Sequence, residues 1–259
     1  MSNVSGNSEV QWWKSFHVIE MADLFLERGN TNEVAQTADF LVKVLALEDG
    51  MRIYDQCCGI GTLANALAKR GMKPVGADLC SIYIDRAKVA AADQGVCSEF
   101  YCEDAFEFVP QPVNATFNWY SSFGYSVSDE QNCDMLRRAF ESLLPGGRFA
   151  MDVPNFPNLM RDFQFNLVRS GISAGREVTC VRESRIDWHA GQLKQVWRWF
   201  SGGGPTIERE SALRIYWPHQ IYEMLNLVGF ENVQMFGDTD QSKLDMKSPR
   251  LILIAQKPK

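Results

Sequence analysis

The stretch Met51-Arg-Ile-Tyr-Asp-Gln-Cys-Cys-Gly-Ile-Gly61 decides the fold of this 259-residue chain. It runs from an apolar alternating segment into a glycine turn, and Thr62–Arg70 continues with apolar residues at helical spacing. Gly59 and Gly61 permit positive φ angles and a close approach of the backbone. A strand, a tight loop and a helix start let backbone N–H groups reach a nucleotide-like ligand. The stretch therefore predicts a ligand-binding loop behind a central strand.

Acidic residues end or follow the expected strands. Asp55 ends the first strand, Asp78 ends the second, and Asp104 follows the third. Ligands in open α/β sheets bind at the carboxyl ends of the strands, so these three side chains are expected at one edge. An acid at the end of the second strand can accept hydrogen bonds from ribose hydroxyls. Together with the glycine loop, this pattern predicts a site for a ligand with an adenosine-like end.

Short apolar segments alternate with helical patterns over most of the chain. The expected strands are 51–55, 74–78, 98–102, 115–120, 148–153, 231–236 and 251–255, and the expected helices are 9–28 (possibly broken), 32–47, 62–70, 81–92, 129–143 and 218–228. This alternation predicts an α/β fold whose sheet is covered by helices on both faces.

The pattern changes after Pro154. Residues 156–168 resemble a short helix, and three extended segments with turn signals between them follow, at 175–186, 193–200 and 207–215. They predict an inserted antiparallel β meander. The expected organisation is therefore a ligand-binding core with N-terminal helices over 1–155, an insertion over 156–216, and a return to the core over 217–259.

Composition excludes several classes of function. The net charge is −6 and no run of Lys and Arg occurs, which disfavours a nucleic-acid partner. No apolar run approaches the roughly 18 residues of a membrane span, and the first residues do not resemble a signal peptide. The seven cysteines form no CxxC pair and the three histidines are scattered, so neither a metal site nor a disulfide framework is expected. We expect a cytoplasmic monomer or homodimer that acts on a small molecule.

The motif Asp55-Gln-Cys57-Cys-Gly59-Ile-Gly61, together with Leu144-Pro-Gly-Gly147, resembles the class I S-adenosylmethionine-dependent methyltransferases. Cys57 stands where the family's D-x-G-x-G-x-G motif has its first glycine. The resemblance covers about residues 40–155 and implies a Rossmann-like seven-stranded methyltransferase sheet. It also implies S-adenosylmethionine as cofactor and S-adenosylhomocysteine as product. The implied cofactor-binding residues are Asp55, Cys57, Gly59, Gly61, Asp78, Leu79, Asp104, Ala105 and Asn118.

The insertion is similar to the antiparallel lid of sugar N-methyltransferases from antibiotic pathways. Those enzymes have an F-S-S-x-G-H segment after the fourth strand, and this chain has Tyr120-Ser-Ser-Phe-Gly-Tyr125, with Tyr125 in place of the histidine. The resemblance implies methylation of a small molecule in specialised metabolism, with nitrogen as the first choice of acceptor atom. Trp12, Trp13 and Phe16 would close an N-terminal lid over the cofactor.

Methyl transfer needs an aligned nucleophile and, for some acceptors, a weak base. Tyr125 and His17 are the predicted catalytic residues, with His219 and Glu177 as further candidates. Arg214 would suit an anionic acceptor through a bidentate pair. The residues predicted to bind the acceptor are Trp13, Tyr120, Ser122, Arg214 and Tyr216.

Two alternatives stay open. One is C- or O-methylation of a small acid or sugar-like metabolite. The other is a non-catalytic protein that binds S-adenosylmethionine as a regulator. A protein or RNA substrate is disfavoured by the acidic composition and by the lack of an N/D-P-P-Y-type tetrapeptide after the fourth strand.

Overall fold

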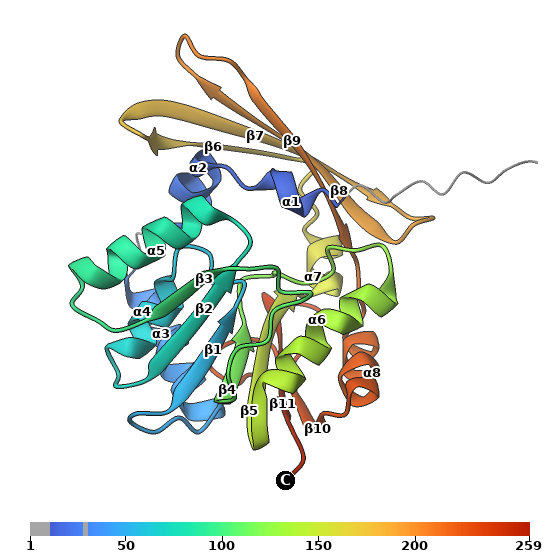
Figure 1. The fold of residues 1–259 in the computed structure, drawn as a ribbon. Helices are drawn as coiled ribbons and strands as arrows, with labels where there is room; N and C mark the ends of the chain where they lie inside the picture. Colours follow the sequence, from blue (N-terminus) through green and yellow to red (C-terminus); the bar gives the residue numbers. More distant parts are fainter. Residues whose placement is uncertain (1–10, 28–30) are drawn as a thin grey trace, which may run out of the picture.

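The computed structural model describes residues 11–27 and 31–259, which form two β-sheets (Figure 1). The larger sheet has seven strands in the order β10-β11-β5-β4-β1-β2-β3, and the smaller has four in the order β6-β7-β8-β9. Strand β11 is antiparallel to β5 and β10, whereas β1, β2, β3, β4 and β5 pair in parallel. The predicted Rossmann-like sheet with an inserted antiparallel β lid is confirmed.

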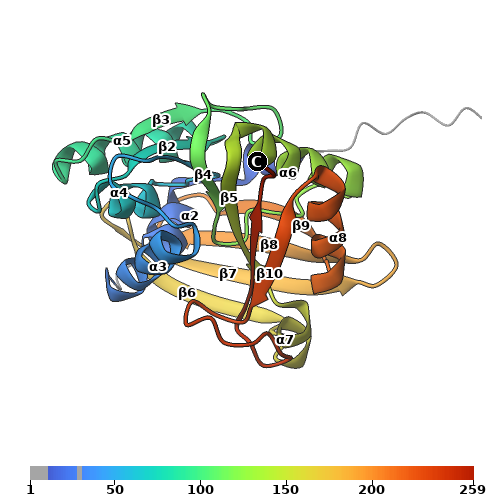
Figure 2. The ribbon, with the colours of Figure 1, turned by 90° about the horizontal axis from the view of Figure 1, so that it is seen from below.

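The core sheet consists of β1 (Arg52–Gln56), β2 (Lys73–Asp78), β3 (Glu99–Cys102), β4 (Val113–Asn118), β5 (Leu143–Pro154), β10 (Glu231–Phe236) and β11 (Arg250–Gln256). The core helices are α3 (Thr31–Val44), α4 (Thr62–Ala68), α5 (Ser81–Asp93), α6 (Asp129–Ser142) and α8 (Pro218–Val228). Helices α3, α4 and α5 cover one face of the sheet, and α6 and α8 cover the other (Figure 2).

Strand β1 lies near the middle of the sheet because both of its faces are apolar. Ile53 packs with Leu41 and Phe117 on one face, and Tyr54 packs with Phe149 on the other; all five side chains are fully buried. Burial of a large apolar side chain contributes roughly 1.5–3 kcal/mol. This two-sided burial holds the end of β1, and the glycine loop behind it, in a fixed position.

Two core elements differ from the sequence prediction. The predicted Leu144–Gly147 turn lies inside β5, which starts at Leu143, and the pairing with β4 shifts register at Val113/Ala115. The N-terminal segment is not one helix but α1 (Trp13–Phe16), α2 (Ile19–Met21) and the π-helical turn η1 (Ala22–Leu26). Part of the predicted 9–28 helix lies outside the described residues.

The lid has one strand more than predicted. Its strands are β6 (Asn166–Ser173), β7 (Arg176–Asp187), β8 (Gln192–Ser201) and β9 (Ile207–Arg214), and only Phe156–Arg161 is helical (α7). The helix predicted over 156–168 was therefore too long. Strand β6 is an edge strand whose Val168 and Ile172 are exposed, so it lacks the apolar inward pattern that marks a buried strand.

The lid lies over one edge of the core sheet, with α1 and α2 between them (Figure 1). Near the end of β9, Arg214 pairs with Asp129 at the start of α6 (3.0 Å), and Tyr216 donates to the same carboxylate (2.8 Å). On the other side, Asp23 of η1 accepts from Arg86 of α5 and from Ser173 of β6. Core, N-terminal segment and lid are thus connected at two separate places. No described helix is long and apolar enough to cross a membrane.

Candidate active site

The loop after β1 uses three left-handed backbone conformations. Cys57, Gly59 and Gly61 have φ angles of +64°, +55° and +74°. A Cβ on Gly61 would lie 2.7 Å from a ring carbon of Phe100, so only glycine fits there. The positive φ of Cys57 explains why glycine suits this position, and a non-glycine residue there stores strain of about 1–2 kcal/mol.

Asp78, at the end of β2, joins the loop to the next helix. Its two carboxylate oxygens accept from the backbone N–H groups of Gly59 and Cys80, each at 2.9 Å. Burial raises the pKa of Asp78, while His17 and the two backbone donors act in the opposite direction. Asp55 is also buried, and both that burial and the charge of Asp78 raise its pKa. Two close acids at the loop favour a ligand that brings donors or positive charge.

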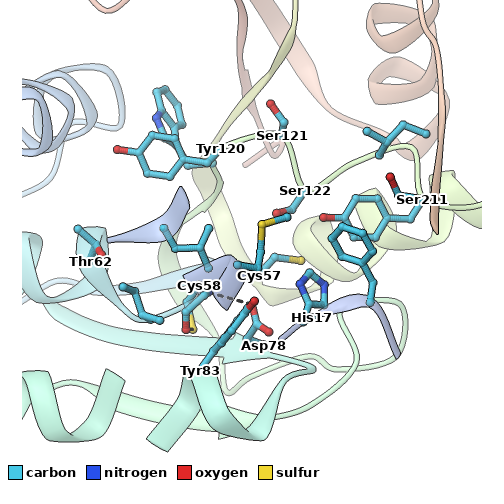
Figure 3. A pocket seen from close by; sticks show the side chains of 18 of the residues that line it. His17, Cys57, Cys58, Thr62, Asp78, Tyr83, Tyr120, Ser121, Ser122 and Ser211 are labelled. Atoms are coloured by element: carbon cyan, nitrogen blue, oxygen red, sulfur yellow. Dashed lines mark hydrogen bonds between the residues drawn. The ribbon is translucent and has the colours of Figure 1, made fainter. Parts of the chain in front are cut away.

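Two adjoining cavities meet at Asp78, which Figure 3 shows among the side chains that line one of them. The larger, here called the transfer cavity, measures about 200 Å³, and the smaller, the adenine-side cavity, about 40 Å³. Residues shared by both are His17, Cys57, Asp78, Ser122 and Tyr125. Because five residues line both spaces, we treat the two cavities as one continuous site.

His17 comes from the N-terminal segment and lies at the boundary of the two cavities. Its ring centroid is 5.5 Å from that of Tyr83, whose hydroxyl donates to the carbonyl of Val18 (3.0 Å). Burial lowers the pKa of His17, and the charge of Asp78 partly opposes this. The imidazole is therefore uncharged at neutral pH and can accept a proton.

This charge state predicts a pH effect on ligand choice. Lowering the pH from about 7 to about 5 increases the fraction of His17 that is cationic, and the cation repels a sulfonium ligand but not a neutral thioether. Protonation of Asp78 weakens both ligands alike. We expect the affinity for S-adenosylmethionine to fall about tenfold relative to S-adenosylhomocysteine. Calorimetry at both pH values checks this ratio, and an unchanged pH dependence in His17→Gln would contradict the assignment.

Tyr125 ends a strained loop that follows β4. The φ angles of Tyr120 and Ser121 are +63° and +69°, a conformation that costs non-glycine residues about 1–2 kcal/mol each. Burial and the neighbouring Cys57 raise the pKa of Tyr125, which hydrogen bonds with Ser122. The phenol is therefore a neutral hydrogen-bonding group rather than a base.

Trp12 connects this loop to the lid. Its indole N–H lies 3.1 Å from the carbonyl oxygens of both Tyr125 and Ala212, and its ring centroid lies 4.9 Å from that of Tyr125. One side chain thus fixes the spacing between the loop 119–125 and strand β9.

Trp12→Phe keeps an aromatic ring but removes the pyrrole part of the indole, and with it the N–H donor. We expect a loss of about 1 kcal/mol in the free energy of unfolding, measured by urea denaturation, because two partly buried carbonyls lose a partner. Trp188→Phe is the matched control, since Trp188 is 72% exposed. Equal effects of the two substitutions would contradict the bridging role.

Most of the predicted site residues line the two cavities. Asp55, Gly59 and Tyr120 line the transfer cavity, and Trp13, Leu79, Asp104 and Ala105 line the adenine-side cavity. Trp13, predicted to bind the acceptor, thus lies on the adenine side. Gly61 lies just outside the lining, at the start of α4.

Other predicted residues are not brought to the cavities. Asn118 lies behind the loop, where its amide donates to Gln56 and to the carbonyl of Ser122 (both 3.3 Å). Arg214 and Tyr216 are engaged by Asp129 at the base of the lid, because strand β9 ends there, and so line neither cavity. His219 and Glu177 are also absent from both linings.

Several lining residues were missed. They are Met21, Leu26, Tyr83, Trp119, Gln195, Trp197, Ser211 and Leu213. The sequence contained one signal for them. Gln195 and Trp197 are two residues apart on β8, and residues two apart on a strand share a face.

The site fits an adenosine-bearing sulfonium cofactor. Asp78 offers a partly buried carboxylate at the adjoining cavities, and the indole N–H of Trp13 is buried without a partner on the adenine side. Such an unpaired donor costs roughly 1–3 kcal/mol unless a ligand or water satisfies it. Asp78, Asp104 and Trp13 are therefore the polar groups available to the cofactor's adenosine end.

Residues 53–147 match the family described as "Methyltransferase domain". This chain therefore contains a methyltransferase domain, and its fold is that of solved methyltransferases. It is 34% identical, over 125 residues, to the S-adenosyl-L-methionine-dependent Diels-Alderase iccD of Talaromyces variabilis, a match that covers 46% of this chain and 41% of iccD. The chain spans less than half the length of the curated relatives it matches.

Two solved methyltransferase structures match this fold over nearly the whole chain. The CcbJ methyltransferase from Streptomyces caelestis has a TM-score of 0.77 at 18% identity, covering 96% of this chain and 99% of CcbJ. The sugar N-methyltransferase KedS8 from a Streptoalloteichus species has a TM-score of 0.72 at 16% identity, covering 100% of this chain and 98% of KedS8. At this level of identity the likeness establishes the fold alone.

Proposed function

We propose that this methyltransferase methylates the nitrogen of a small-molecule amine in the biosynthesis of a specialised metabolite. The observation that supports this best is the aromatic lining of the transfer cavity. Its aromatic residues are Trp12, Phe16, His17, Tyr83, Trp119, Tyr120, Tyr125 and Trp197. The fold shared with the sugar N-methyltransferase KedS8 is consistent with this choice.

An aromatic cavity suits an amine for two physical reasons. Faces of Trp and Tyr attract the ammonium cation that methyl transfer generates, by about 0.5–2 kcal/mol each. An apolar environment also lowers the pKa of an ammonium group, so the amine enters as the neutral nucleophile. A strong general base is then unnecessary, which agrees with the raised pKa of Tyr125.

When bound, S-adenosylmethionine would supply an electrophilic methyl group to the amine lone pair and would leave as the neutral thioether, and the ammonium group so formed would lose a proton. Neutral His17 can accept that proton at the boundary of the two cavities. Tyr125 and Ser122 can orient the amine by hydrogen bonds, and positioning of this kind can supply several kcal/mol of the barrier reduction.

A cofactor-assisted cycloaddition is the second candidate. The 34% identity with iccD favours it, and an aromatic cavity without a strong base also suits an apolar polyene. In that reaction the methyl group would stay on the cofactor.

The test uses cofactor with an isotope-labelled methyl group and a panel of primary amines, hydroxylated amines, phenols and polyenes, read by mass spectrometry. We expect the label on an amine nitrogen, and at least about tenfold slower transfer by Tyr125→Phe at unchanged S-adenosylhomocysteine affinity. Label on oxygen or carbon would replace the N-methyl proposal. A cyclised polyene with no label transferred would favour the second candidate.

A further inference from the structure

The inner face of the lid contains one buried polar row. Ser184, Gln195 and Ser211 lie opposite each other on β7, β8 and β9, and each is 8% exposed or less. The amide of Gln195 donates to Ser184 (3.2 Å), Ser211 donates to the amide oxygen of Gln195 (3.3 Å), and the indole of Trp197 donates to Ser211 (3.2 Å). A fully connected row of this kind presents a fixed pattern of donors and acceptors.

The row lies at the boundary between the transfer cavity and a further cavity of about 700 Å³, here called the outer cavity. Gln195, Ser211 and Trp12 line both. Figure 3 shows Ser211 on the side of the transfer cavity away from Asp78. A molecule that enters the transfer cavity from the outer cavity therefore passes these three side chains.

The volumes of the two cavities indicate which part of an acceptor each cavity can hold. Sites for drug-sized ligands measure about 300–1,000 Å³. The transfer cavity, at about 200 Å³, has to hold much of the cofactor and leaves room only for the reacting end of an acceptor. The outer cavity, at about 700 Å³, is large enough for the rest of it.

The charged residues of the outer cavity favour an acceptor whose part in that cavity is neutral. Its charged lining residues have both signs: Glu183, Arg185, Lys194, Arg209 and Glu210. Lys194 is already paired with Asp187 (2.6 Å), and the guanidinium of Arg209 donates to the carbonyl of Ser15 (2.8 Å). An anionic group would therefore meet two engaged cations and two carboxylates beside Arg185, whereas hydroxyl groups can bond to either sign.

We propose that the acceptor is a two-part molecule, with an amine head in the transfer cavity and a neutral, hydroxylated body in the outer cavity, and that Gln195 and Ser211 select it at the boundary. This inference rests on the proposed N-methylation for the head and extends it to the body. It makes Gln195 and Ser211 specificity-determining residues.

The test uses three probes with the same head: benzylamine, 4-(aminomethyl)phenyl β-glucoside and 4-(aminomethyl)phenyl phosphate. Each is titrated by calorimetry into the protein saturated with S-adenosylhomocysteine. We expect the glucoside to bind about tenfold more tightly than benzylamine, and the phosphate no more tightly. In Gln195→Leu and in Ser211→Ala the advantage of the glucoside should disappear, with benzylamine binding unchanged.

Gln192→Leu is the matched control. Gln192 is a buried glutamine of the same strand that lines neither cavity, and its substitution should leave the ranking of the probes unchanged. Unaltered S-adenosylhomocysteine affinity verifies that each variant is folded. A glucoside no tighter than benzylamine, a phosphate that binds best, or an advantage retained in both lid variants would overturn the proposal.

Methyl transfer to the same probes separates this proposal from the one on function. Glucoside-selective binding without N-methylation would contradict the proposed reaction but support the selection at Gln195 and Ser211. Methylation of benzylamine and the glucoside with equal kcat/KM would support the proposed reaction but contradict the selection at Gln195 and Ser211.

Discussion

Asp78→Ala is expected to weaken S-adenosylhomocysteine binding at least about hundredfold. The partly buried carboxylate is the acceptor we assign to the ribose hydroxyls, and each charge-assisted hydrogen bond contributes about 1.5–3 kcal/mol. The substitution also removes the acceptor of the Gly59 and Cys80 backbone N–H groups, so the loop loses its support. Isothermal titration calorimetry measures the effect.

Asp78→Asn separates these two contributions. Asparagine keeps one acceptor oxygen for a backbone donor but loses the charge, so we expect an affinity between those of the wild type and Asp78→Ala. Asp93→Ala, at the exposed end of α5, is the control and should bind as the wild type does. Wild-type affinity in Asp78→Ala would refute the assignment of the ribose.

Gly124→Ala is expected to destabilise the protein by roughly 2–5 kcal/mol. The substitution introduces backbone strain at a positive φ and also a steric clash of the new Cβ. Gly124 has a φ of +84°, and a Cβ there would lie 2.7 Å from the backbone oxygen of Arg214. The same two residues share a backbone hydrogen bond, from the N–H of Arg214 to the carbonyl of Gly124 (2.6 Å). Because Gly124 directly precedes Tyr125, methyl transfer should fall together with stability.

Gly175→Ala measures the cost of backbone strain alone, without a steric clash of the added Cβ. Gly175 has a φ of +76° and nothing within 4 Å of the added Cβ, so we expect a loss of only about 1–2 kcal/mol. Urea unfolding of both variants gives the comparison. Equal losses would show that the contact between the loop and Arg214 does not constrain the lid.

The cofactor half of the site was predictable because it depends on local sequence. The glycine loop, Asp78 and Asp104 all follow short strands directly, and parallel strands bring their carboxyl ends to one edge. The positive φ of Cys57 was not predictable, because nothing in its side chain signals a left-handed conformation.

The acceptor half was less predictable because it depends on how distant strands pair. Gln195 and Ser211 acquire their role from the register of β8 against β9, which one sequence does not specify. Arg214 and Tyr216 were predicted to bind the acceptor from their position at the end of an extended segment. Asp129, 85 residues before Arg214, engages both instead.

The N-terminal segment contacts both sides of the site. Val18 accepts from Tyr83 of the core, Asp23 binds both core and lid, and Trp12 bridges the loop 119–125 and β9. The segment therefore cannot lift from the cofactor without also loosening the wall of the acceptor site. We therefore expect any opening of residues 11–27 to expose both sides of the site at the same time.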